Sequence, residues 1–127
     1  MGYSIMIIDD SETIRAVLER TLAMTKLPID SVIQANNGKE ALDKLETLWI
    51  DIIFSDINMP VMDGIKFVET VSASPEYKHI PVVIVSTEGS TTRIDNLIKK
   101  GVKGYLRKPF TPEKIRDIII TTLGEWK

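Results

Sequence analysis

Five short runs rich in isoleucine and valine alternate along the chain with longer segments of helical periodicity. The runs cover residues 5–8, 31–35, 51–55, 82–85 and 103–106. Strands that alternate with helices form parallel sheets, and strands that are apolar on both faces need helices on both sides. We therefore predict an α/β fold, a doubly wound sheet of five parallel strands with five helices divided between its faces. The run over residues 32–35 is the most polar, which predicts an edge strand.

The predicted helices carry their own start and stop signals. Ser11, Asn37 and Thr111 occupy N-cap positions, Pro112 follows in a first turn, and Gly101 is suited to end the fourth helix. Apolar spacing predicts the buried faces. The predicted inward residues are Ile14, Val17, Leu18, Thr21 and Leu22; Ala41, Leu42, Leu45 and Leu48; Ile65, Val68 and Val71; Ile94, Leu97 and Ile98; and Ile115, Ile118, Ile119 and Leu123.

Length and composition exclude several classes of protein. A chain of 127 residues fits one domain, over residues 1–127, and leaves no room for a second. The net charge of -2 gives no general attraction to nucleic acid or to an anionic membrane. The absence of cysteine excludes disulfides and thiolate metal sites, and the N-terminus lacks the features of a secretory signal. We expect a cytoplasmic protein.

Polar side chains follow the predicted strands where the strands end. Each has a structural explanation when taken alone, because Asp and Ser often form turns or cap helices. The carboxyl ends of parallel strands meet at one edge of a sheet, which is where α/β proteins bind ligands. Three carboxylates at one edge raise one another's pKa unless cations compensate, so the set implies a ligand. Its members are Asp9, Asp10, Asp56, Ser86, Thr87 and Lys108.

The donor atoms indicate which ligand. Carboxylates without histidine or cysteine favour Mg²⁺ or Mn²⁺, and Mg²⁺ commonly binds one or two carboxylates together with phosphate oxygens. A lysine and a hydroxyl can stabilise the charge of a phosphoryl group during transfer, and an aspartate can attack it to give an acyl phosphate. The pattern therefore predicts metal-dependent phosphoryl chemistry.

Four segments resemble the receiver domain of bacterial response regulators, within it the single-domain chemotaxis type: IMIIDDSETIR, DIIFSDINMPVMDGIKF, IPVVIVSTEG and GVKGYLRKPFTPEKI. The resemblance covers essentially the whole chain, and the motifs occur in the order of the family. It implies a flavodoxin-like sheet of order 2-1-3-4-5 and a receiver domain without an output domain.

The resemblance also implies a role for each polar residue. Asp56 would be the phospho-acceptor, and Asp10 and Asp56 would bind Mg²⁺ or Mn²⁺ directly. Asp9 would act through water and Asn58 through its backbone carbonyl. Ser86 and Lys108 would contact the phosphoryl group, and the bond between Lys108 and Pro109 would be cis.

Further implied roles concern signalling. Ser86 and Tyr105 would form the switch that responds to phosphorylation, and we hypothesise that Asn58 and Glu88 orient a hydrolytic water that shortens the life of the phosphoryl group. A sensor histidine kinase would be the donor, and the fourth helix, fifth strand and fifth helix would bind a separate protein. A monomer is expected. The basic residues of that surface would suit an acidic partner; they are Arg93, Lys99, Lys100, Lys103 and Arg107.

Two other functions share parts of this pattern. A Mg²⁺-dependent phosphatase also uses an aspartate nucleophile, but such enzymes generally have an acid-base aspartate two residues later, where this chain has Asn58. An interaction module that keeps the fold without phosphorylation is the other alternative. We expect a chain that catalyses only its own phosphorylation and dephosphorylation. The pathway, chemotaxis-like or a phosphorelay, stays open.

Overall fold

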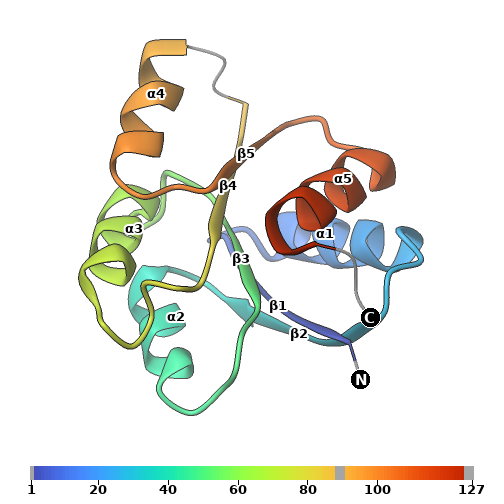
Figure 1. Cartoon of the computed structure of the whole chain (residues 1–127), viewed down its shortest axis with the longest axis horizontal. Coiled ribbons are helices and arrows are strands. Elements are labelled where there is room, and N and C mark those ends of the chain that lie inside the picture. Colours follow the sequence, from blue (N-terminus) through green and yellow to red (C-terminus); the bar gives the residue numbers. More distant parts are fainter. Residues whose placement is uncertain (1, 88–90, 125–127) are drawn as a thin grey trace.

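The computed structural model of the chain, which describes residues 2–87 and 91–124, contains one parallel sheet with helices on both faces (Figure 1). The strand order is β2-β1-β3-β4-β5. This confirms the predicted fold class and strand order, including β2 at an edge. The strands are β1 (Tyr3–Ile8), β2 (Ile29–Ala35), β3 (Ile52–Ser55), β4 (Val82–Ser86) and β5 (Gly104–Arg107). The helices are α1 (Glu12–Met24), α2 (Gly38–Leu45), α3 (Gly64–Ala73), α4 (Thr91–Lys99) and α5 (Pro112–Leu123).

The sheet separates two apolar cores. Helices α1 and α5 cover one face, and α2, α3 and α4 cover the other (Figure 1). Neighbouring residues of a strand point to opposite faces, so Ile7 packs with α1 and α5 while Ile8 packs with α2 and α3. β3 and β4 are buried along their whole length, which explains their continuous apolar sequence.

Short polar side chains define where most helices begin. Ser11, Asn37 and Thr111 cap α1, α2 and α5 as predicted, and Asp63 caps α3, each accepting a hydrogen bond from a backbone N–H three residues later. Gly101 has φ +112° two residues after α4, a conformation that favours glycine. Within the described residues, none of the helices combines the length and the apolar character that a bilayer span requires.

The prediction of an inward-facing side chain is wrong for three residues. Val17 is 38% exposed, Leu48 41% and Ile98 55%. Leu48 lies beyond the end of α2 at Leu45, so helical spacing no longer applies to it. The buried side of α1 runs through Arg15, Leu18 and Leu22, which turns Val17 toward solvent.

Val61 adopts a backbone conformation that is unfavourable for its side chain. Its φ is +67°, and Met62 N donates to Pro60 O at 2.7 Å, which closes a three-residue turn between β3 and α3. A β-branched residue in the left-handed region costs about 1–2 kcal/mol, whereas asparagine tolerates it. Val61 is 78% exposed, so little packing would be lost on replacement.

We expect Val61→Asn to raise the free energy of unfolding by about 1 kcal/mol, because it relieves that steric cost. Urea denaturation would measure the change. Val17→Asn is the matched control, since Val17 is also exposed but lies inside α1, where asparagine lowers helix stability. A loss of stability in Val61→Asn would contradict the strain assigned to this turn.

Candidate functional site

The polar side chains predicted from the strand ends lie at one edge of the sheet. Asp9 and Asp10 follow β1, Asp56 follows β3, Ser86 ends β4 and Lys108 follows β5. These four strands are consecutive neighbours in the sheet. Backbone hydrogen bonds join their ends: Asp56 N donates to Ile8 O at 2.9 Å, and Lys108 N donates to Ser86 O at 2.8 Å. The carboxyl edge of the sheet therefore collects all five residues.

Three carboxylates form the centre of this edge. Oxygen atoms of Asp9, Asp10 and Asp56 lie within 4.8 Å of one another. Asp9 is buried, Asp56 is half-buried and Asp10 is exposed. Asp9 Oδ1 accepts from Ser11 N at 2.9 Å, and Asp56 Oδ1 accepts from Ile57 N at 2.8 Å, so local backbone donors orient two of the three.

The electrostatics of the cluster favour a bound cation. Burial raises the pKa of Asp9, and the charges of Asp56 and Asp10 raise it further, while the Ser11 hydrogen bond and Lys108 lower it. Lys108 Nζ lies 3.9 Å from Asp9 Oδ2, so one ammonium group faces three carboxylates. An oxygen-only donor set with excess negative charge fits a hard divalent cation such as Mg²⁺ or Mn²⁺.

The raised pKa of Asp9 predicts a pH-dependent stability. The folded protein holds the Asp9 proton more tightly than the unfolded chain, so unfolding free energy falls as pH rises above the ordinary value of 3.8. Asp9→Asn removes this buried charge while it keeps an oxygen that accepts from Ser11 N. In the presence of a chelator, we expect Asp9→Asn to be more stable than the parent at pH 7 and equal to it near pH 3, as measured by urea denaturation. A gain that persists at low pH would contradict this electrostatic origin.

The remaining predicted residues have different surroundings. Ser86 is buried at the end of β4, and the peptide bond between Lys108 and Pro109 is cis. Tyr105 is half-buried and packs against the core beneath α2, α3 and α4. Asn58 is exposed, two residues after Asp56. Glu88 lies outside the described residues. The assigned roles of all these residues stay predictions.

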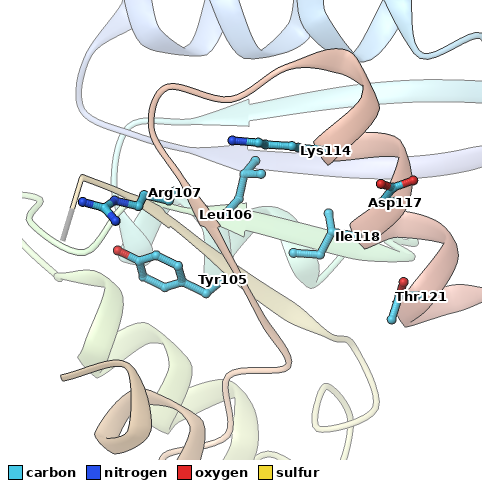
Figure 2. A pocket seen from close by; sticks show the side chains of 7 residues that line it. All are labelled: Tyr105, Leu106, Arg107, Lys114, Asp117, Ile118 and Thr121. Atoms are coloured by element: carbon cyan, nitrogen blue, oxygen red, sulfur yellow. The ribbon is translucent and has the colours of Figure 1, made fainter. Parts of the chain in front are cut away.

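A groove of about 430 Å³ lies between β5 and α5. Figure 2 shows Tyr105 and Arg107 extending from β5, and Lys114, Asp117 and Ile118 from α5. Leu106 and Ile118 supply apolar surface, and Arg107 and Lys114 supply positive charge beside the carboxylate of Asp117. The groove lies on the surface expected to bind a partner protein.

Arg15 is the residue near the site that the sequence reasoning missed. It is buried, and its Nη1 donates to Asp9 O at 2.6 Å. The missed signal was its position: Arg15, Leu18 and Leu22 follow one helical stripe at spacings of three and four.

Known proteins similar to this chain share its motifs and its fold. The family model of the response regulator receiver domain matches residues 5–120. The chain is 37% identical over 126 residues to a chemotaxis protein CheY homolog of Campylobacter jejuni, covering 95% of both proteins. It is 34% identical over 121 residues to chemotaxis protein CheY1 of Helicobacter pylori, covering 94% of this chain and 96% of that protein.

Solved structures give the same result. Chemotaxis response regulator CheY4 of Vibrio cholerae superposes with a TM-score of 0.83 at 33% identity, covering 97% of this chain and 100% of that one. A structure named as a putative response regulator of Chloroflexus aurantiacus superposes with a TM-score of 0.89 at 25% identity, covering 98% of this chain and 100% of that one. The chain belongs to the response regulator receiver domain family, of the CheY type, which implies a place in two-component signalling.

Proposed function

We propose that this receiver domain is a phospho-switch in which Asp56 accepts a phosphoryl group with the help of Mg²⁺ or Mn²⁺. One observation carries the proposal: the carboxylates of Asp9, Asp10 and Asp56 lie within 4.8 Å of one another, and Lys108 lies beside Asp9. Three carboxylates that repel one another destabilise the fold unless a cation binds between them. A bound divalent cation can in turn hold the oxygens of a phosphoryl group. The donor is a sensor histidine kinase, which would encounter the domain in the cytoplasm.

Each residue has a distinct part in this reaction. Asp10 and Asp56 would hold the cation with their carboxylates, Asp9 through water and Asn58 through its backbone carbonyl. A divalent cation at this position supplies charge neutralisation for the phosphoryl oxygens. Asp56 Oδ1 accepts from Ile57 N, so the other carboxylate oxygen of Asp56 would attack phosphorus. As the new P–O bond forms, the bond between phosphorus and the histidine nitrogen of the donor would break, and the imidazole of the kinase would leave.

Lys108 and Ser86 complete the set of groups around the phosphoryl oxygens. The Lys108 ammonium lies within reach of the cluster, at 3.9 Å from Asp9 Oδ2, and would pair with a phosphoryl oxygen. Ser86 ends the neighbouring strand, where its hydroxyl would turn toward the phosphoryl group. Tyr105 on β5 pairs with Ile84 across the ladder, two residues before Ser86, and would respond to a movement of Ser86.

Incubation with acetyl phosphate and Mg²⁺, followed by mass measurement of the intact chain, tests the proposal. We expect the transient addition of one phosphoryl mass to the parent protein and none to Asp56→Asn. Turnover of general phosphoesters would instead indicate the phosphatase, although Asn58 stands where such an enzyme needs an acid-base aspartate. If the mass of the chain does not change under any condition, the result would favour the interaction module that acts without phosphorylation.

The proposed output surface comprises α4, β5 and α5. The groove between β5 and α5 presents Arg107, Lys114 and Asp117 beside apolar side chains (Figure 2). Lys99 is the last residue of α4, and Lys100 follows it. Such a surface would suit a partner segment that is acidic and partly apolar. Lys100 Nζ also lies 3.7 Å from Glu69 Oε2 of α3, so Lys100 forms an ion pair within the domain.

Reversal of the charge at Lys99 and Lys100 is expected to weaken binding of the phosphorylated domain to its partner about 5-fold to 20-fold, because like charges replace attractive ones. Phosphorylation of Asp56 should proceed at the parent rate. The matched control reverses Lys39 of α2 and Lys66 of α3, which are exposed elsewhere. Binding would be followed by calorimetry with the partner, and loss of phosphorylation in the Lys99 and Lys100 variant would contradict the placement of this surface.

The lifetime of the phosphoryl group would depend on Asn58 and Glu88. We propose that these side chains orient the water that hydrolyses the acyl phosphate. Asn58 is exposed two residues after Asp56, which leaves its side chain accessible to water. Replacement of both residues by apolar ones should slow dephosphorylation, and an unchanged rate would remove this role.

A further inference from the structure

Arg15 of α1 is an unusual buried charge. It is 8% exposed, and among the described residues Asp9 is the only other charged residue that is buried. An arginine loses much hydration free energy when it is buried, so its hydrogen-bond partners must compensate. The partners of Arg15 therefore indicate what its burial accomplishes.

The guanidinium of Arg15 joins three segments of the chain. Its Nη1 donates to the backbone oxygen of Asp9 at 2.6 Å and to Asn36 Oδ1 at 2.8 Å. Its Nε donates to Gln34 Oε1 at 2.9 Å. These three acceptors are all uncharged oxygens, one on the residue that follows β1, one on β2 and one in the loop between β2 and α2.

The two amide partners are themselves held in orientation. Asn36 Nδ2 donates to Glu40 Oε2 at 3.0 Å, and this hydrogen bond is the main reason that the pKa of Glu40 is lowered. Gln34 Nε2 donates to Glu19 Oε1 at 3.2 Å. Each amide thus turns its NH₂ group to a carboxylate and its oxygen to Arg15, so the guanidinium faces a prearranged set of acceptors.

Arg15 contacts Asp9 at the peptide unit that connects Asp9 to Asp10. Asp9 N donates to Ala35 O at 3.1 Å, and Asp9 O accepts from Arg15 Nη1. Because the peptide unit is planar, fixing Asp9 O also fixes the direction in which Asp10 leaves the strand. Asp10 is exposed, so its position depends on the turn that Asp9 begins.

We propose that Arg15 is a positioning residue for the phosphoryl site: by holding the backbone carbonyl of Asp9, it sets the turn that brings the carboxylates of Asp9 and Asp10 to Asp56. This inference rests on the proposed function, since the carboxylates need this arrangement only if they bind a cation. Arg15 would act through the carbonyl of Asp9 and not by direct contact with the cation or the phosphoryl group. Residues that orient metal ligands in this way commonly change metal affinity by about 10-fold to 100-fold when replaced.

The test is the dissociation constant for Mg²⁺ of Arg15→Lys, measured by isothermal titration calorimetry on folded protein. Lysine keeps the positive charge but lacks the planar fork that reaches Asp9, Asn36 and Gln34 together. We expect binding of Mg²⁺ to weaken about 10-fold. Arg116→Lys is the matched control, because Arg116 Nη1 also donates to a backbone oxygen, that of Thr25, at 3.0 Å and at the opposite end of α1.

Several outcomes would overturn the inference. Parent-like Mg²⁺ affinity in Arg15→Lys would show that the fork does not position the carboxylates. An equal loss in Arg116→Lys would assign the effect to general stability, which urea denaturation of both variants would quantify. If the parent protein itself does not bind Mg²⁺, the proposed function fails, and this result is distinct from the others.

A second variant keeps the test decisive if Arg15→Lys does not fold. Asn36 is exposed, so Asn36→Ala should be tolerated, and it removes one of the two acceptors of Nη1. We expect a loss of Mg²⁺ affinity of about 3-fold, and a double variant with Arg15→Lys should lose less than the product of the two single losses. Parent-like affinity in Asn36→Ala, or independent losses in the double variant, would contradict the shared network.

Discussion

Replacement of Lys108 by methionine is expected to slow phosphorylation of Asp56 by acetyl phosphate about 10²-fold to 10³-fold, the usual effect of removing one preorganised charge donor from a transition state. Methionine keeps much of the length of the side chain and removes its ammonium group. That group lies 3.9 Å from Asp9 Oδ2, at the edge where the phosphoryl oxygens would gather. The rate of mass gain at saturating Mg²⁺ measures the effect.

The same substitution should strengthen Mg²⁺ binding, so the two measurements move in opposite directions. Lys108 partly neutralises the cluster of Asp9, Asp10 and Asp56, and its removal leaves more negative charge to attract the cation. Lys114→Met is the control, since Lys114 is an exposed cation on α5 and should leave both quantities unchanged. A slower rate together with weaker Mg²⁺ binding would indicate a disturbed site instead of a lost charge.

The second large effect is expected at Gly64, the first residue of α3. A Cβ atom there would lie 2.1 Å from the backbone oxygen of Asp56 and 3.0 Å from Ile57 Cα. Backbone atoms cannot move aside as a side-chain end can, and Gly64 N also donates to Ile57 O at 2.7 Å. We therefore expect Gly64→Ala to lower the free energy of unfolding by about 3 kcal/mol and the midpoint of thermal unfolding by about 10 °C.

Gly104→Ala provides the comparison for this prediction. Its Cβ would lie 3.0 Å from Ile118 Cδ1, the end of a flexible side chain, so we expect a loss below about 1 kcal/mol. Phosphorylation of the folded fraction of Gly64→Ala should also be slowed, because relief of the clash must displace the main chain at Asp56. Equal stability of the two variants would contradict the tight packing of α3 against the acceptor strand.

The sequence predicts the sheet and the collection of polar residues at its edge for one physical reason. Strands buried on both faces need almost only apolar residues, so a run such as Ile52–Ser55 is easily recognised, and the polar residue that follows it marks the strand end. Since parallel strands end at the same edge, the approach of Asp9, Asp10 and Asp56 follows from topology.

Features that depend on how elements pack could not be predicted in the same way. Ile98 has the right spacing to face inward, but its exposure depends on the angle at which α4 lies on the sheet. Arg15 looks like a surface residue by type, and its burial depends on acceptors from β2 and the following loop. Helical spacing places it on the same stripe as Leu18 and Leu22.

The helices differ in how firmly the sheet holds them. Among the side chains of α4 that are described, Leu97 alone is buried, whereas α3 buries Phe67, Val68 and Val71. Burial of one leucine contributes about 1.5–3 kcal/mol, and Ile94 is only half-buried, so the described side chains hold α4 on the sheet mainly through Leu97. A conformational change that begins at Asp56 would therefore cost the least free energy if it moved α4. The other helices would keep their positions on the sheet while α4 adopts a new one.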